Sequence, residues 1–356
     1  MTTATTTPGA HTLSEILSEP QCWAQCLEVL QKSGEIENAL GRLPARSDWL
    51  FIGCGSSFYV AQAAASSWTA LTGQRASAIP ASELLLFPAL ALSSASCQPV
   101  LISRSGHTSE VIQAAHYLES RANLRALAIT CVSGAQLEKT CTATLHLLPA
   151  DEQSMVMTRS FTSMLLGLQT LAATVAKQSA FLESLLKLPA LAQTALDPLP
   201  SRVREFVGSR HFADYMFLGQ GPFYGMASES MLKVMEMSCS YAQVFHTLEF
   251  RHGPKSIVSP QTLVGFLLSE SAYKAEREVL EEVKGLGGTT LVVANSAEDR
   301  VRGSADFLVE LNLGVTEQAR LTSYVLTGQL LGLFTGLKKG LDPDRPPNLS
   351  RAVVLG

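Results

Sequence analysis

The chain has 356 residues, enough for two average domains, and 46% of them are hydrophobic while 16% are charged, which is typical of a globular protein. Its net charge of −4 offers no basic field for nucleic acid and excludes a polyanion as the expected partner. Because the sequence has no long uncharged apolar stretch and no basic leader, we expect a soluble cytoplasmic protein that contacts no membrane. The seven cysteines form no Cys-x-x-Cys pair, which favours reduced thiols.

The N-terminal region is rich in threonine and is predicted to be a loose arm followed by a helix that begins near Thr12 or Ser14. A boundary between two domains is expected within residues 188–201, where prolines cluster and hydrophobic periodicity lapses. We therefore assign an arm and helix, a first domain, a second domain and a tail to residues 1–35, 36–195, 196–345 and 346–356.

An internal repeat is the most informative feature of the chain. DWLFIGCGSSFYVA at 48–61 reads as strand, glycine turn and helix, and DYMFLGQGPFYGMA at 214–227 repeats it. The next predicted strands, PVLISRS at 99–105 and GFLLSES at 265–271, keep the same offset of 166 residues. Short apolar strands that alternate with helices are typical of parallel sheets covered on both faces. The sequence therefore predicts an α/β fold of two doubly wound parallel-sheet domains in tandem.

The glycine turn GCGSS is a weak nucleotide signal, because it lacks the third glycine and the later acid of a dinucleotide fingerprint. A polar loop follows the second strand, in LISRSGHTSEVI at 101–112, where hydroxyls, a glycine and the N–H groups of a starting helix can hold an anion. The alternative is an ordinary Ser/Thr-capped turn. His107 is a further candidate ligand in this loop. The second copy lacks the glycine and the threonine, and its Glu270 would repel an anion, so we expect the anion site in the first domain only.

A charged stripe is predicted on the Met-rich segment 222–243, which reads as a helix opened by Pro222. Glu229, Lys233 and Glu236 are spaced i, i+4 and i+7 and share one face of this helix. The stripe is either a solvated face with an ordinary ion pair or a face turned toward a site. Because the helix follows a glycine turn at the end of a strand, we favour the site.

His252 lies in TLEFRHGPKSIV, where a His-Gly-Pro turn is stiff enough to hold an imidazole in place. The chain has no His-x-x-x-His, no Cys/His cluster and no Asp-rich loop, so we expect no metal site. It also has no Gly-x-Ser-x-Gly elbow, which disfavours a serine nucleophile.

Seven motifs in this order resemble the sugar isomerase (SIS) superfamily: GCGSS, ASEL, SRSGHT, MTRSFT, ESMLKVMEMS, EFRHGP and DRPPNLSRAVVL. The similarity runs from about residue 36 to the end of the chain. It is nearest to the isomerase module of glucosamine-6-phosphate synthase. MTRSFT and FRHGPKSIV look more like the branch of tagatose-6-phosphate ketose/aldose isomerase and galactosamine-6-phosphate deaminase.

The resemblance implies a sugar phosphate as substrate and no organic cofactor. The residues assigned to substrate and phosphate binding are Ser103, Arg104, Ser105 and Thr108, with Gly55 and Ser57 from the first glycine turn and with Glu229 and Arg351. Glu236 is implied to be the base that moves a proton between C1 and C2. Lys233 and Glu229 are implied to line the site. His252 is implied to assist ring opening from the partner subunit, and therefore we expect a homodimer.

Two departures from the synthase narrow the expected activity. Arg351 stands where the synthase has a tail lysine that engages the ketose carbonyl, and an arginine that stays protonated forms no Schiff base. With about 35 residues ahead of the first domain, we also expect no amidotransferase half. Isomerisation or ammonia release from an aminosugar 6-phosphate is then expected. The alternative is a sugar-phosphate sensor, which needs the loop but not the pair Glu236 and His252.

Overall fold

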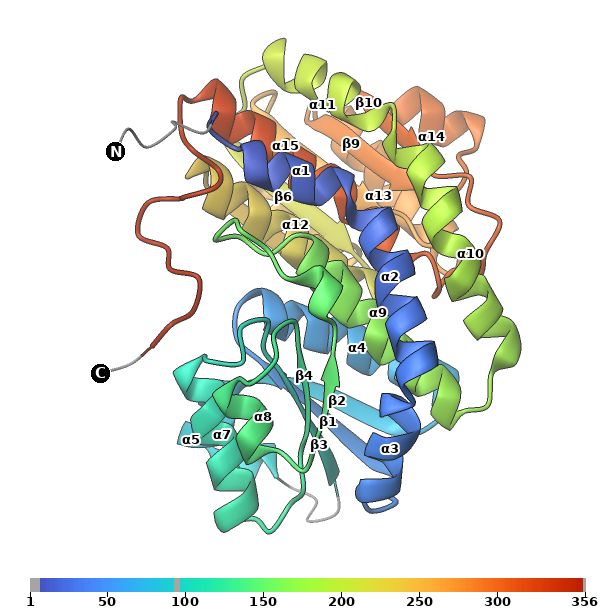
Figure 1. Cartoon of the computed structure of the whole chain (residues 1–356). Helices are drawn as coiled ribbons and strands as arrows, with labels where there is room; N and C mark the ends of the chain where they lie inside the picture. The colour runs from blue at the N-terminus through green and yellow to red at the C-terminus, as the bar shows by residue number, and fades with distance from the viewer. Residues whose placement is uncertain (1–6, 93–96, 355–356) are drawn as a thin grey trace, which may run out of the picture. The chain divides into compact units, whose positions relative to one another are not determined.

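The computed structural model describes residues 7–92 and 97–354, so most of the predicted loose arm lies outside the described residues. The chain divides into two compact units (Figure 1). Unit A comprises residues 19–152, 159–189 and 350–356, and unit B comprises residues 1–18, 153–158 and 190–349. The cut at residue 189 falls inside helix α10 (Ser179–Leu196), at its internal Pro189.

Unit A is built on a five-stranded parallel sheet with the order β2-β1-β3-β4-β5. Its strands are β1 (Asp48–Gly53), β2 (Arg75–Pro80), β3 (Cys97–Ile102), β4 (Leu127–Thr130) and β5 (Ala143–His146). Helices α2 (Glu19–Ser33), α4 (Ser56–Thr72) and α9 (Arg159–Val175) pack together in one layer. Helices α5 (Ala81–Leu86), α7 (Ser109–Ser120) and α8 (Gln136–Thr140) pack in another. The remaining helices of this unit are α3 (Glu35–Arg42), α6 (Pro88–Ala91) and the 3-10 turn η1 (Leu148–Ala150).

Unit B repeats this plan with the order β7-β6-β8-β9-β10. Its strands are β6 (Asp214–Gly219), β7 (Ala242–His246), β8 (Thr262–Leu267), β9 (Thr289–Ala294) and β10 (Phe307–Glu310). Helix α15 (Leu326–Lys338) packs against α1 (Ala10–Leu17), α11 (Leu199–Gly208) and α12 (Phe223–Ser238). Helices α13 (Tyr273–Gly285) and α14 (Asp299–Ser304) pack together. Short 3-10 turns are η2 (Glu249–Arg251), η3 (Pro254–Ile257) and η4 (Leu321–Tyr324).

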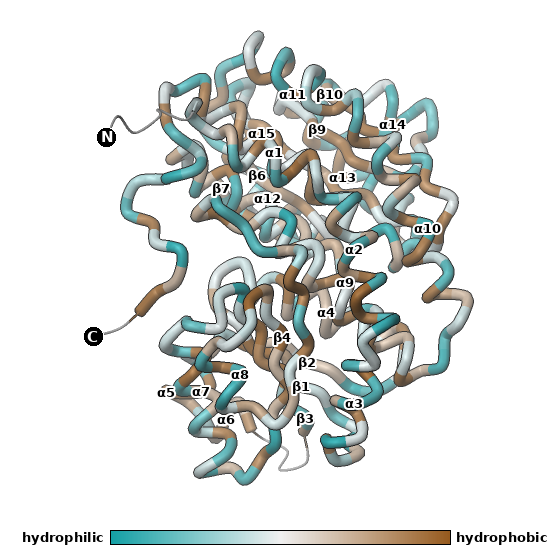
Figure 2. The backbone as a smooth tube through the Cα atoms, in the orientation of Figure 1, coloured by the Kyte–Doolittle hydropathy of each residue, from teal (hydrophilic) through white to brown (hydrophobic). Residues whose placement is uncertain are grey.

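The two sheets therefore have the same strand order, and the predicted tandem of doubly wound domains is confirmed. Strands β1 and β6 are buried from their second residue onward, and β3 and β8 are buried throughout, as continuous apolar runs predict for parallel sheets. Figure 2 shows the hydrophobic colour along the central strands of both units. None of the described helices is long and apolar enough to cross a bilayer. All seven cysteines lie in the described part of the chain, and none forms a disulfide.

Two predicted helix boundaries are wrong. Helix α1 begins at Ala10, ahead of Thr12, because the Asp344 carboxylate accepts hydrogen bonds from the N–H groups of His11 and Thr12 at 3.0 and 2.7 Å. The helix predicted over 222–243 ends at Ser238, where Cys239 takes a left-handed conformation with a φ of 48°. The chain then enters strand β7, because tertiary pairing overrides the local helical pattern.

Candidate functional site

The predicted phosphate loop connects β3 to α7 in unit A, and its residues Ser103, Arg104 and Ser105 are buried. Gly106 has a φ of 61°, and a Cβ there would lie 2.4 Å from the Cβ of Ala135, so this tight turn requires glycine. The Ser103 hydroxyl accepts a hydrogen bond from Gly106 N at 3.1 Å. The loop is therefore a compact turn.

Thr108 occupies the N-cap of α7, but its hydroxyl makes no cap hydrogen bond to the helix. Instead, it lies 3.3 Å from the Ser103 hydroxyl. His107 is exposed, and its backbone N–H donates to the Ser105 hydroxyl at 3.2 Å. Ser103 and Ser105 therefore cap this turn, as the alternative interpretation predicts, whereas the Thr108 hydroxyl makes no cap bond to α7 and keeps its capacity to bind an anion.

The glycine turn that carries Gly55 and Ser57 follows β1, the direct neighbour of β3. A Cβ on Gly53 would lie 2.4 Å from the Ser57 carbonyl oxygen, and Gly55 has a φ of 55°, so both positions require glycine. Ser57 is buried in the first turn of α4. Because β1 and β3 are parallel, both loops follow the carboxyl ends of their strands and lie at the same end of the sheet. This is the point at which the strand order reverses. Unit A thus brings the predicted hydroxyl ligands together at the carboxyl ends of β1 and β3.

The Arg104 guanidinium is buried in an ion pair, with Nη1 3.1 Å from Oε2 of Glu152. Its Nη2 donates to the carbonyl oxygen of Arg351 at 3.0 Å. Glu152 also accepts hydrogen bonds from the backbone N–H of Ser160, at 3.1 Å, and from its hydroxyl. Sequence reasoning missed Glu152, although an acid lying just before the MTRSFT motif was a signal for it. The ion pair between Arg104 and Glu152 therefore connects the phosphate loop to the interior of unit A.

Arg351 lies beside the same loop, although it is 247 positions from Arg104 in the sequence. Its side chain is partly exposed and forms an ion pair with Asp151. Two residues further on, the carbonyl oxygen of Val353 accepts a hydrogen bond from Ser109 N, the first residue of α7, at 3.1 Å. The backbone of the tail is therefore attached to the loop at Arg104 and to the start of α7 at Ser109.

The charged stripe of α12 is buried in unit B, which contradicts the alternative of a solvated face. Glu229 and Lys233 are fully buried, and the Glu236 side chain is 16% exposed. The Lys233 ammonium lies 3.2 Å from Oε1 of Glu229 and is hydrogen-bonded to Oε2 of Glu236. Burial by itself would lower the pKa of Lys233, but the two carboxylates outweigh it and raise that pKa. Lys233 therefore stays an ammonium, and Glu236 is the member of the triad that reaches solvent.

His252 is exposed at the end of the 3-10 turn η2, ahead of Gly253 with a φ of 122°. Its flanking cations are engaged elsewhere: Arg251 and Lys255 pair with Glu282 at 2.7 and 3.3 Å. Within the described residues, the His252 side chain makes no hydrogen bond or ion pair. Its imidazole is therefore available for a ligand or another subunit.

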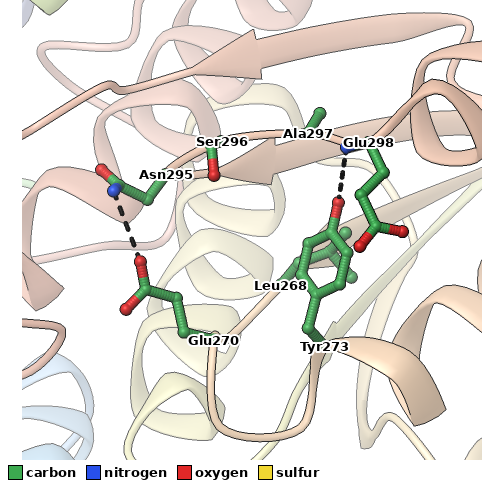
Figure 3. A pocket seen from close by; sticks show the side chains of 7 residues that line it. All are labelled: Leu268, Glu270, Tyr273, Asn295, Ser296, Ala297 and Glu298. Atoms are coloured by element: carbon green, nitrogen blue, oxygen red, sulfur yellow. Dashed lines mark hydrogen bonds between the residues drawn. The ribbon is translucent and has the colours of Figure 1, made fainter.

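A pocket of about 230 Å³ lies at the carboxyl ends of β8 and β9 in unit B (Figure 3). The residues lining it are Leu268, Glu270, Tyr273, Asn295, Ser296, Ala297 and Glu298. None of the predicted site residues is among them, and we do not assign the substrate to this pocket. In the described part of the chain, no group of three or more His, Cys, Asp or Glu side chains is arranged to hold a metal.

Comparison with known families settles the fold family. The model of the SIS domain matches residues 45–174 and 214–335. The chain belongs to the SIS domain family. The resemblance predicted from the seven motifs is thereby confirmed, and one matched segment covers the β1 to β5 sheet while the other covers β6 to β10.

Similar SIS proteins include both deaminases and aminotransferases. A Streptomyces coelicolor protein provisionally named D-galactosamine-6-phosphate deaminase AgaS is 30% identical, over 96% of this chain and 94% of its own. The glutamine–fructose-6-phosphate aminotransferase of Methanothermobacter thermautotrophicus is 25% identical over 96% of this chain, which spans only 57% of that protein. The crystal structure of glucosamine-6-phosphate deaminase from Thermotoga maritima is 28% identical, with a TM-score of 0.78, and the match covers 97% of this chain and all of that one.

Proposed function

We propose that this SIS protein is a phosphosugar isomerase or aminosugar-phosphate deaminase that transfers a proton between C1 and C2 of a sugar 6-phosphate. The observation that carries this proposal is the buried triad of α12, in which one carboxylate reaches solvent beside a fully buried ammonium. A protein that only binds a sugar phosphate has no need of a buried charge cluster of this kind. The names of the similar deaminases support the same class of reaction.

In this proposal, Glu236 removes a proton at the C1–C2 bond and returns it to the neighbouring carbon. Lys233 sets a positive charge against the Glu236 carboxylate and against the negative charge that develops on an enediol or enolamine. Glu229 holds Lys233 in place from the other side, at 3.2 Å. Proton transfer of this kind requires neither a metal nor an organic cofactor.

The phosphate is assigned to the loop after β3, with Ser103, Ser105, Thr108 and the nearby Ser57 as donors. The Thr108 hydroxyl supports this assignment, because it stands at the N-terminus of α7 and makes no cap bond. Arg104 contributes positive charge, although its guanidinium is held by Glu152 at 3.1 Å. The cation in the tail is Arg351, which forms no Schiff base with a ketose, and this favours isomerisation or ammonia release.

His252 is assigned to ring opening in the active site of a partner subunit, so the proposed enzyme is a homodimer. The exposed imidazole with no side-chain partner in the described residues supports this role.

The decisive experiment supplies the purified protein with glucosamine-6-phosphate, galactosamine-6-phosphate, fructose-6-phosphate and tagatose-6-phosphate. Ammonia release and aldose–ketose exchange are measured separately, together with incorporation of solvent deuterium at C1 and C2. Glu236→Gln is expected to abolish deuterium exchange while phosphosugar binding persists, because it removes the proton carrier and leaves the phosphate loop intact. Exchange at the wild-type rate in Glu236→Gln would refute the assigned base. Tight binding without exchange by the wild type would favour a sensor.

A further inference from the structure

The second copy of the phosphate loop lies in unit B, between β8 and α13, and it already holds an anion. The carboxylate of Glu317 accepts three hydrogen bonds there: from Glu270 N, from Ser271 N at 3.2 Å and from the Ser271 hydroxyl at 2.6 Å. Two successive N–H groups and a serine hydroxyl at the start of a helix are the donors that such loops offer to phosphate. Here the occupant comes from the chain itself, 46 residues further along.

The internal repeat gives Glu317 a counterpart in unit A. Glu152-Gln153 and Glu317-Gln318 are related by an offset of 165, and the same offset relates the Leu-Leu-Gly segments at 165–167 and 330–332. In unit A, Glu152 contacts its loop through an ion pair with the Arg104 side chain, at 3.1 Å. The two matched carboxylates therefore serve the two loops in different ways.

The difference follows from one inverted charge. Glu270 occupies the position of Arg104 in the repeat, so it cannot pair with Glu317. Its carboxylate forms an ion pair with Arg320 and lies 3.4 Å from the Asn295 amide, across the pocket shown in Figure 3. With no cation on the loop side chain, the Glu317 carboxylate is stabilised by hydrogen bonds from two loop N–H groups and from the Ser271 hydroxyl.

We propose that Glu317 is a built-in substitute for phosphate, which closes the second-domain loop so that the chain keeps a single phosphate site. A carboxylate on the same chain loses no translational entropy when it binds, whereas a free anion does. The carboxylate therefore outcompetes a free anion for the same donors. The proposal rests on the proposed function for the identity of the anion. It extends that function by explaining why two copies of one loop yield one ligand site.

The test uses the full-length chain with Ser105→Ala and Thr108→Ala, which weaken the first-copy loop, and inorganic phosphate as the probe. Adding Glu317→Ala removes the occupant and leaves its three donors in place, while the charge of Glu270 stays compensated by its ion pair with Arg320. We expect phosphate affinity to rise at least tenfold over the background, with one additional phosphate bound per chain in equilibrium dialysis. Adding Ser271→Ala to that variant should reduce the gained affinity again. Glu317→Gln is the matched control, because its side-chain carbonyl can still accept from the loop and keep phosphate out.

No gain of phosphate binding in a Glu317→Ala chain with a wild-type near-UV spectrum would overturn the proposal. Amide hydrogen exchange of the unmodified protein gives a second measurement that does not depend on any variant. The Glu270 and Ser271 amides should be protected and should not respond to added phosphate, and exchange at the unprotected rate would equally refute the proposal. Phosphate binding by the wild type at Ser105 and Thr108 is measured in parallel, so failure of the proposed function is recognised separately.

Discussion

Gly332 of α15 packs directly against the backbone of Lys233 in α12, so closely that a Cβ on Gly332 would lie 2.5 Å from the Lys233 carbonyl oxygen. Gly336, one helical turn further along, meets the Met237 carbonyl oxygen in the same way, and Gly328, one turn earlier, packs against the Ser230 side chain. The position of the buried charge triad is therefore set by backbone contact between two helices.

We expect Gly332→Ala to push the helices apart and to cost about 1–3 kcal/mol of stability, the usual range for overpacking. The rate of the proposed reaction should fall as well, because Glu229, Lys233 and Glu236 are displaced together with α12. Urea unfolding and deuterium exchange into substrate measure the two effects. Gly303→Ala is the control, since a Cβ there meets nothing within 4 Å, and it should leave both quantities near wild type.

Lys233→Met should destabilise the protein by about 3–5 kcal/mol, because it leaves Glu229 buried without its cation. The double variant Lys233→Met with Glu229→Gln should recover much of that stability but no activity. Calorimetry together with the exchange assay separates these outcomes. The exposed i,i+4 pair of Lys32 and Glu28 is the control, and Lys32→Met should leave unfolding unchanged. A stable and active Lys233→Met protein would contradict the proposed role of the triad.

Ser105→Ala combined with Thr108→Ala should raise the Kd for 6-phosphosugars at least tenfold. Each lost charge-assisted hydrogen bond to phosphate is worth about 1.5–3 kcal/mol. Titration calorimetry with the unreactive variant Glu236→Gln measures binding alone. Ser120→Ala, at the exposed far end of α7, is the control. Unchanged affinity would remove the basis for assigning phosphate to this loop.

The partner role of His252 predicts complementation. Mixing inactive Glu236→Gln chains with inactive His252→Ala chains should restore part of the activity, since one of the two sites in a heterodimer then holds both intact groups. Subunit exchange is verified by mass-tagging the two chains. Exchange without recovery of activity would mean that both groups serve a site within one chain.

Glu276 makes stability depend on pH. Burial raises the pKa of Glu276 to about 7, although the hydrogen bonds that its carboxylate accepts from Ser269 N and Oγ act to lower that pKa. A raised carboxyl pKa means that the folded state holds the proton more tightly, so its contribution to stability is lost as pH rises from about 4.5 to about 7. The difference in unfolding free energy between wild type and Glu276→Gln should therefore change by roughly 3 kcal/mol across that window. A difference that is flat with pH would disprove the raised pKa.

Periodicity and repetition in the sequence determined the fold class, the tandem arrangement and the shared face of Glu229, Lys233 and Glu236. These features depend on local spacing, and the pattern of apolar residues reports spacing directly. The same pattern placed the end of helix α12 five residues too late in the sequence. The start of β7 at Ala242 is decided by its pairing with β6, which the pattern does not show.

Contacts between distant segments were decided by the tertiary structure alone. The acid before the MTRSFT motif is visible in the sequence, but no local pattern shows that Glu152 pairs with the Arg104 guanidinium. Nor does one show that Arg351 lies beside the phosphate loop or that Glu317 fills the loop of the second copy. Each of these contacts joins residues whose separation in sequence carries no periodic signal. Buried or partly buried charges must find opposite charges or hydrogen-bond donors, and only the folded chain determines which ones lie within reach.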